Sequence, residues 1–196
     1  MIKEDKIDNS KEYHRRSIRL KEYDYSQNGG YFITICTNGG ECLFGNIVIG
    51  EMQLNKYGII IRKEWLKTGE MRSNLLIDEF IIMPNHLHGI IMIMDNCRGT
   101  LQRAPTVEQF GKPVSNSIPT IIRLFKASTT KQINQVRHTS GTSIWQRNYY
   151  EHVIRNEEDL KQIREYIVNN PRKWELDSEN PENIKNGKID FKTIIM

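Results

Sequence analysis

The amino-acid sequence predicts one domain of the α+β class, with a mainly antiparallel sheet and helices packed on it. The chain has 196 residues, enough for a single core. Its composition is typical of a folded protein, with 38% hydrophobic and 27% charged residues. Runs of β-branched and aromatic residues alternate with segments of helical periodicity, so strands and helices share the same domain.

The first half of the chain predicts three strands and one helix. The run at 31–37 (YFITICT) has strand composition and ends in an Asn-Gly-Gly turn. Apolar residues recur at helical spacing over 55–67, which predicts a helix. Two apolar runs follow at 75–83 and 86–94, and Pro84 lies between them, so we expect a pair of strands.

The second half begins with a helix that either Ser117 or Asn116 caps, with Pro119 in its first turn. Aromatic and β-branched residues predict another strand over 144–155. A last helix is expected over 157–169, where acidic residues occupy the first turn and complement the helix dipole.

The order strand, helix, strand, strand, helix, strand, helix is the pattern of a ferredoxin-like sandwich with one additional C-terminal helix. We expect a basic N-terminal arm over 1–28 and the folded domain over 29–174. A loop or linker is expected at 95–117, and a polar tail at 175–196.

The charge is moderately basic, with a formal net charge of +4 and a pI near 8.9. Such an excess favours an anionic partner, although solvated surface explains it equally well. Cations concentrate in the N-terminal arm and along the second predicted helix. The candidates for DNA contact are Arg15, Arg16, Arg19, Arg123 and Lys126.

The cysteines and the hydropathy pattern predict a soluble cytoplasmic protein with no membrane partner. Cys36, Cys42 and Cys97 are odd in number and lack CxxC spacing, which favours a reducing compartment. The first residues are charged and do not resemble a secretory signal. The most apolar stretch, 80–94, is too short to cross a bilayer.

His86 and His88 are candidate metal ligands. They stand two apart in a predicted strand, so their side chains leave the same face about 6 to 7 Å apart along the chain. Two imidazoles so placed can share one ion. The same spacing also occurs in hydrogen-bonded histidines with no ligand, so the pair alone does not decide.

Tyr166 and Asn170 stand four apart on the last helix, on one face and about 6 Å apart along the axis. This arrangement suits a phenol and an amide that act at one site. It equally suits an aromatic residue at the edge of the core and an asparagine that ends the helix before Pro171.

Five sequence blocks, in order from about residue 13 to 174, resemble the REP-associated tyrosine transposases, single-tyrosine members of the HUH nuclease superfamily. The blocks are RRSIRLKEYDYS, YFITICT, MPNHLHGIIM, WQRNYYEHVIRNEEDL and REYIVNNPRKW. The resemblance implies that His86 and His88 bind a metal, that Asn170 completes the metal site, and that Tyr166 is the nucleophile.

The resemblance further implies a metal-dependent endonuclease and strand transferase that cuts hairpin-associated single-stranded DNA through a 5′-phosphotyrosine. Low-charge nitrogen and oxygen ligands with open positions suit Mg or Mn. The family implies a monomer and hairpins formed by repetitive extragenic palindromes. It also makes Arg15, Arg16 and Arg19 candidates for reading the bases at the hairpin foot.

Two other functions remain open at this point. One is a non-catalytic nucleic-acid-binding regulator on the same fold, which does not need Tyr166. The other is a zinc hydrolase in which His86 and His88 hold the ion and water attacks. Tyr149 and Tyr150 are less suitable nucleophiles, because they lie in a predicted strand and lack an amide one helical turn away. His152 is expected to be structural or to contact DNA.

Overall fold

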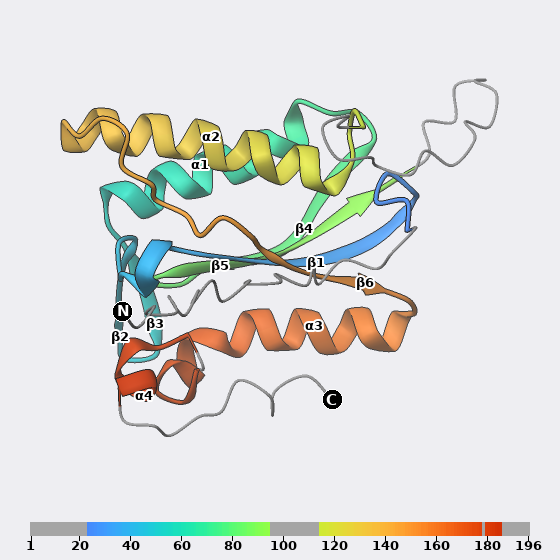
Figure 1. The fold of residues 1–196 in the computed structure, drawn as a ribbon. Helices are drawn as coiled ribbons and strands as arrows, with labels where there is room; N and C mark the ends of the chain where they lie inside the picture. The colour runs from blue at the N-terminus through green and yellow to red at the C-terminus, as the bar shows by residue number, and fades with distance from the viewer. Residues whose placement is uncertain (1–22, 95–113, 178, 186–196) are drawn as a thin grey trace, which may run out of the picture.

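The structure, a computed structural model, describes residues 23–94, 114–177 and 179–185 (Figure 1). Its centre is a four-stranded antiparallel sheet in the order β4-β5-β1-β6. The strands are β1 (Gly29–Cys36), β4 (Leu75–Ile82), β5 (His86–Ile93) and β6 (Tyr150–Ile154). The helical connection from β1 to β4 crosses over β5, which lies between them. The helical connection from β5 to β6 crosses over β1 in the same way. This order confirms the ferredoxin-like sandwich.

Three long helices cover the two faces of the sheet. They are α1 (Lys56–Glu70), α2 (Ile118–Arg137) and α3 (Glu157–Asn169). Figure 1 shows α1 and α2 on one face and α3 on the other. Each helix begins after a side chain that accepts hydrogen bonds from its first turn, namely Asn55, Ser117 and Asn156. The sequence therefore specified the helix starts, including Ser117 rather than Asn116.

The two faces of the sheet differ in the size of their cores. The face under α1 and α2 carries the main cluster, which includes the fully buried Trp65, Leu87 and Ile91. The face under α3 carries a small one, in which Ile90 packs with Leu160 and Ile167. The helix predicted to carry the nucleophile is therefore held by few apolar contacts.

Strand alternation places the histidines on the α3 face. Leu87 and Ile91 of β5 belong to the core under α1 and α2, whereas Ile90 belongs to the core under α3. Because successive side chains of a strand point to opposite faces, His86 and His88 project toward α3. In the neighbouring β1, Thr34 pairs with His88.

The strand predicted over 144–155 is too long, since β6 covers only Tyr150–Ile154. Before it, the backbone forms an isolated antiparallel bridge between Trp145 and Thr37, just beyond β1, and then turns toward α2. The ammonium of Lys126 on α2 donates to the carbonyls of Gln146 and Asn148 at 2.9 and 2.8 Å. Trp145 is buried and its indole N–H donates to Thr129 at 2.8 Å.

Several short elements were not predicted. A two-stranded hairpin, β2 (Gly45–Val48) and β3 (Glu51–Leu54), precedes α1, and its turn holds Ile49 at a φ of 52°. Four-residue strands are too short to show a clear alternation. The others are η2 (Asn170–Leu176) and α4 (Pro181–Lys185), whereas the single turn η1 (Asn38–Gly40) lies where the Asn-Gly-Gly turn was predicted.

Much of the predicted arm, linker and tail lies outside the described residues, and their boundaries remain predictions. The described end of the arm joins the fold, because Tyr25 is buried in the main core. In the part of the chain that the structure describes, no helix is long and apolar enough to span a membrane.

Candidate metal and nucleophile site

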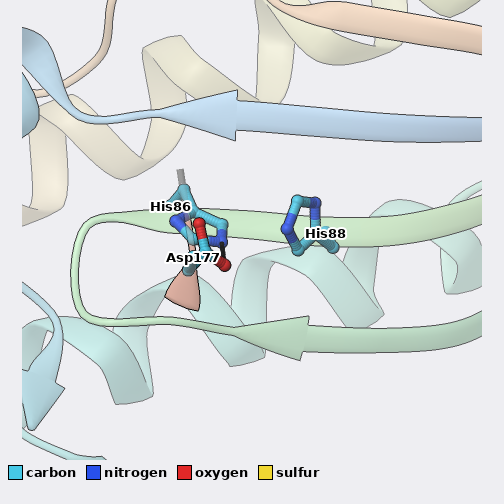
Figure 2. A group of neighbouring side chains, drawn as sticks. All are labelled: His86, His88 and Asp177. Atoms are coloured by element: carbon cyan, nitrogen blue, oxygen red, sulfur yellow. Dashed lines mark ion pairs between the residues drawn. The ribbon is translucent and has the colours of Figure 1, made fainter. Parts of the chain in front are cut away.

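His86 and His88 lie side by side on the interior strand β5 (Figure 2). They face the layer formed by α3 and the residues after it. Both are buried, and their ring centroids are 4.4 Å apart. A strand with neighbours on both sides gives these rings a rigid support.

The hydrogen bonds of Asn85 determine which nitrogen of His86 carries the proton. The amide nitrogen of Asn85 donates to the carbonyls of Gly40 and Glu179, at 3.1 and 2.6 Å. The amide oxygen of Asn85 therefore faces Nδ1 of His86, at 2.9 Å, and accepts a hydrogen bond from Nδ1–H. The Nε2 lone pair of His86 is left free, and this buried atom has no hydrogen-bond partner among the described residues.

His88 is held between two hydroxyl groups. The hydroxyl of Thr34 lies 2.8 Å from Nδ1, and the hydroxyl of Tyr166 lies 3.2 Å from Nε2. Both hydroxyls can donate or accept. When Nδ1–H donates to Thr34, Nε2 becomes an acceptor, as a metal ligand must be.

Burial keeps both histidines neutral at physiological pH. It lowers the pKa of His88 to about 3 and the pKa of His86 well below its usual value, with the neighbouring His88 lowering the latter further. Neutral rings with an available Nε2 are the form that binds a metal ion.

Tyr166 lies on α3 and reaches the histidines while keeping access to solvent. Its ring is 39% exposed and packs edge-on against His88 and Phe32, with centroid distances of 5.2 and 6.0 Å. Burial of the hydroxyl end raises the pKa of Tyr166, and the nearby charge of Asp177 raises it further. The phenol is therefore neutral at physiological pH.

An ion pair joins the middle of α3 to the sheet. The guanidinium of Arg164 donates two hydrogen bonds to the Asp78 carboxylate of β4, at 2.9 and 2.6 Å. Arg164 stands two residues before Tyr166. The pair therefore supports the helix next to the tyrosine.

Asn170, directly after α3, is 3% exposed. Its side chain favours the ionised forms of Tyr166 and Asp177, which opposes the effect of burial on their pKa values. Its Oδ1 is buried and has no hydrogen-bond partner among the described residues.

Asp177 follows η2 and was not predicted, because it lies in a polar segment with no periodic pattern. One carboxylate oxygen, Oδ1, accepts the backbone N–H of Glu179 at 2.7 Å, and the other lies 3.9 Å from Nε2 of His86. Ligand atoms of His86, His88 and Asp177 all lie within 4.8 Å of one another. Figure 2 shows the carboxylate beside His86.

The other candidate residues lie apart from this site or outside the described residues. Arg123 is exposed on α2, and Lys126 on the same helix binds backbone carbonyls, on the face of the sheet opposite the histidines. Arg15, Arg16 and Arg19 lie outside the described residues.

The remaining aromatic and histidine candidates have packing or ion-pair roles. Tyr149 packs against the core under α1 and α2, and Tyr150 packs edge-on against Phe32. His152 pairs with Asp159, at 3.0 Å, in the first turn of α3. Tyr166, by contrast, contacts His88 directly.

The fold and the site define an α+β protein with the architecture of a REP-associated tyrosine transposase. A solved structure of such a transposase, bound to a REP hairpin, aligns with 87% of this chain and 75% of its own, at a TM-score of 0.50 and 19% identity. A protein of Deinococcus radiodurans described as a candidate transposase aligns with 77% of this chain and 97% of its own, at a TM-score of 0.41 and 14% identity. The alignment with the REP-associated tyrosine transposase confirms the predicted resemblance at the level of the fold.

A sequence relative defines the family more narrowly. An uncharacterized protein of Haemophilus influenzae is 46% identical over 170 residues, which cover 84% of this chain and 92% of the relative. The chain belongs to the same family as this Haemophilus influenzae protein. No family model matches the chain.

Proposed function

We propose that this protein is a metal-dependent single-strand DNA endonuclease and strand transferase of the transposase type. The observation that carries the proposal is the 3.2 Å contact between the hydroxyl of Tyr166 and Nε2 of the buried His88. A phenol on a residue that is 39% exposed, beside two neutral imidazoles, combines a candidate nucleophile with candidate metal ligands.

The residues of the proposed site fit a divalent cation, Mg or Mn. Nε2 of His86 and Oδ1 of Asn170 are buried acceptors without partners among the described residues, a costly arrangement that a cation would relieve. His86, His88 and Asn170 would hold it. When bound, such an ion supplies Lewis-acid stabilisation of charge on the scissile phosphate.

The chain's own residues would perform the covalent step. The oxygen of Tyr166 attacks phosphorus, a Tyr166–phosphate bond forms, and the bond from phosphorus to the 3′ oxygen breaks. The tyrosine loses its proton and the departing 3′ oxygen gains one, which leaves a 5′-phosphotyrosine and a 3′-hydroxyl. Another 3′-hydroxyl can reverse the step and join strands. Asn85 and Thr34 orient the two imidazoles.

We propose single-stranded DNA beside a hairpin as the substrate, since the structurally similar transposase was solved with a REP hairpin. Tyr166 on a helix needs an unpaired, flexible phosphodiester to align for in-line attack. The proposed enzyme is a cytoplasmic monomer whose catalytic domain spans 29–174. Basic side chains, including Arg15, Arg16 and Arg19, would contact phosphates or bases.

The experiment is incubation of a labelled single-stranded hairpin oligonucleotide with Mn²⁺ and either wild type or Tyr166→Phe. Tyr150→Phe is the matched control, because Tyr150 also contacts Phe32 but not His88. We expect a denaturant-stable protein–DNA adduct with wild type and the control that is lost in Tyr166→Phe and with chelator. Cleavage without an adduct would instead support a hydrolase in which water attacks. Binding without cleavage would support a non-catalytic regulator.

A further inference from the structure

The carboxylate of Asp177 is placed where an additional metal ligand would be. Its side chain is 5% exposed, and Oδ1 is fixed by the backbone N–H of Glu179, so the other oxygen points toward His86. Within the described part of the chain, Asp177 forms no ion pair with lysine or arginine. A buried carboxylate without a cationic partner is unfavourable.

The contact with His86 does not neutralise this carboxylate. At 3.9 Å it is too long for a hydrogen bond, and Nε2 of His86 has no partner among the described residues. The proton that His86 donates to Asn85 is on Nδ1, the other ring nitrogen. Two acceptors therefore face each other across a gap.

A cation fits this gap with little rearrangement. Two donor atoms that each lie about 2.1 Å from a shared ion are at most about 4.2 Å apart. The ligand atoms of His86, His88 and Asp177 already lie within 4.8 Å of one another, so small side-chain movements would bring them into range. A carboxylate would also offset part of the ion's charge, which neutral imidazole and amide ligands do not.

We infer that Asp177 is a fourth protein ligand of the proposed metal ion, so that binding of the ion fastens the segment after α3 to the central strand of the sheet. The inference rests on the proposed metal site. It adds an anionic ligand from outside the sequence blocks that suggested the function.

The surrounding hydrogen bonds explain how one ion can hold this segment. The backbone carbonyl of Asp177 accepts from the side chain of Asn183 and the backbone of Asn180, each at about 3 Å. Asn85 joins the carbonyl of Glu179 to Nδ1 of His86. An ion bound by His86 and Asp177 would therefore add a second link between β5 and the segment after α3.

The test is Mn²⁺ binding to the full chain without DNA, measured by loss of the free-ion electron paramagnetic resonance signal. Asp177→Asn keeps the acceptor for Glu179 N–H and removes the charge; Glu179→Gln removes a neighbouring charge and is the matched control. We expect Asp177→Asn to raise the Kd at least about tenfold, Asp177→Glu to recover part of the affinity, and Glu179→Gln to change it less than about threefold. Mn²⁺ should also protect residues 170–185 from proteolysis in wild type but not in Asp177→Asn.

The outcomes separate this inference from the proposed function. Binding that His86→Ala abolishes and Asp177→Asn leaves unchanged would overturn the role of Asp177 and leave the metal site standing. Equal weakening by Asp177→Asn and Glu179→Gln would indicate a general charge effect and would also overturn it. Absence of Mn²⁺ binding by wild type would refute the metal site itself.

Discussion

Removing the ion pair between Arg164 and Asp78 should loosen the helix that carries Tyr166. The pair is bidentate, but Arg164 is 45% exposed and Asp78 12%, so solvent reduces its contribution to about 1 kcal/mol. Only Leu160 and Ile167 of α3 are buried, at about 2 kcal/mol each, so the pair is a sizeable part of what holds the helix. In Arg164→Met, the population with α3 undocked should rise about fivefold.

Hydrogen exchange followed by mass spectrometry measures this effect. Peptides from α3 should exchange about fivefold faster in Arg164→Met, while peptides from α1 stay unchanged. Lys161→Met is the control, because it removes an exposed cation from the same helix without touching Asp78. Equal exchange of α3 in wild type and Arg164→Met would refute the argument that this pair holds the helix in place.

Three further predictions concern stability. Burial lowers the pKa of His88 to about 3 from an unfolded value near 6.5, so below pH 6.5 the unfolded chain binds more protons than the folded one. In chelator, urea titrations should show stability falling between pH 7.5 and 5, by about 2 kcal/mol from His88 and by a further loss of the same sign from His86, and a flat profile would contradict the burial of neutral rings. Gly89→Ala should lower the free energy of unfolding in urea by about 1 to 3 kcal/mol, because the new Cβ would lie 2.7 Å from the Trp65 ring. An unchanged unfolding midpoint would show that the Trp65 side chain moves aside without cost. Ile49→Asn should raise stability by about 0.5 to 1 kcal/mol in the same assay, because asparagine tolerates the positive φ of this turn better, and a loss would point to an unseen role for Ile49.

The long elements were predictable because their signals are local. Asn55 and Asn156 cap the first and last long helices, and the apolar periodicity of each helix agrees with the face it buries. The strands at 75–82 and 86–93 were predicted to within one residue of each end. Local propensity and tertiary packing agree at these positions.

The segment before β6 and the position of Asp177 were not predicted, because both depend on contacts between residues far apart in the sequence. The segment before β6 has strand composition, but Lys126 binds its carbonyls, and no pattern within 144–155 reveals that pairing. Likewise, the spacing of His86 and His88 predicted a shared face, and the structure places them on one. Asp177 reaches them only through the turn of η2, which the sequence alone does not specify.

The two histidines lie in the sheet, whereas the groups opposite them lie on α3 and in the residues after it. The two sets of residues are therefore made at different times on the ribosome. All four strands of the central sheet are complete in sequence at Ile154, whereas Tyr166, Asn170 and Asp177 are translated afterwards. The whole sheet with both histidines therefore leaves the ribosome before the nucleophile does. The proposed cutting activity would arise only late in translation, after the part of the protein that supports it has been made.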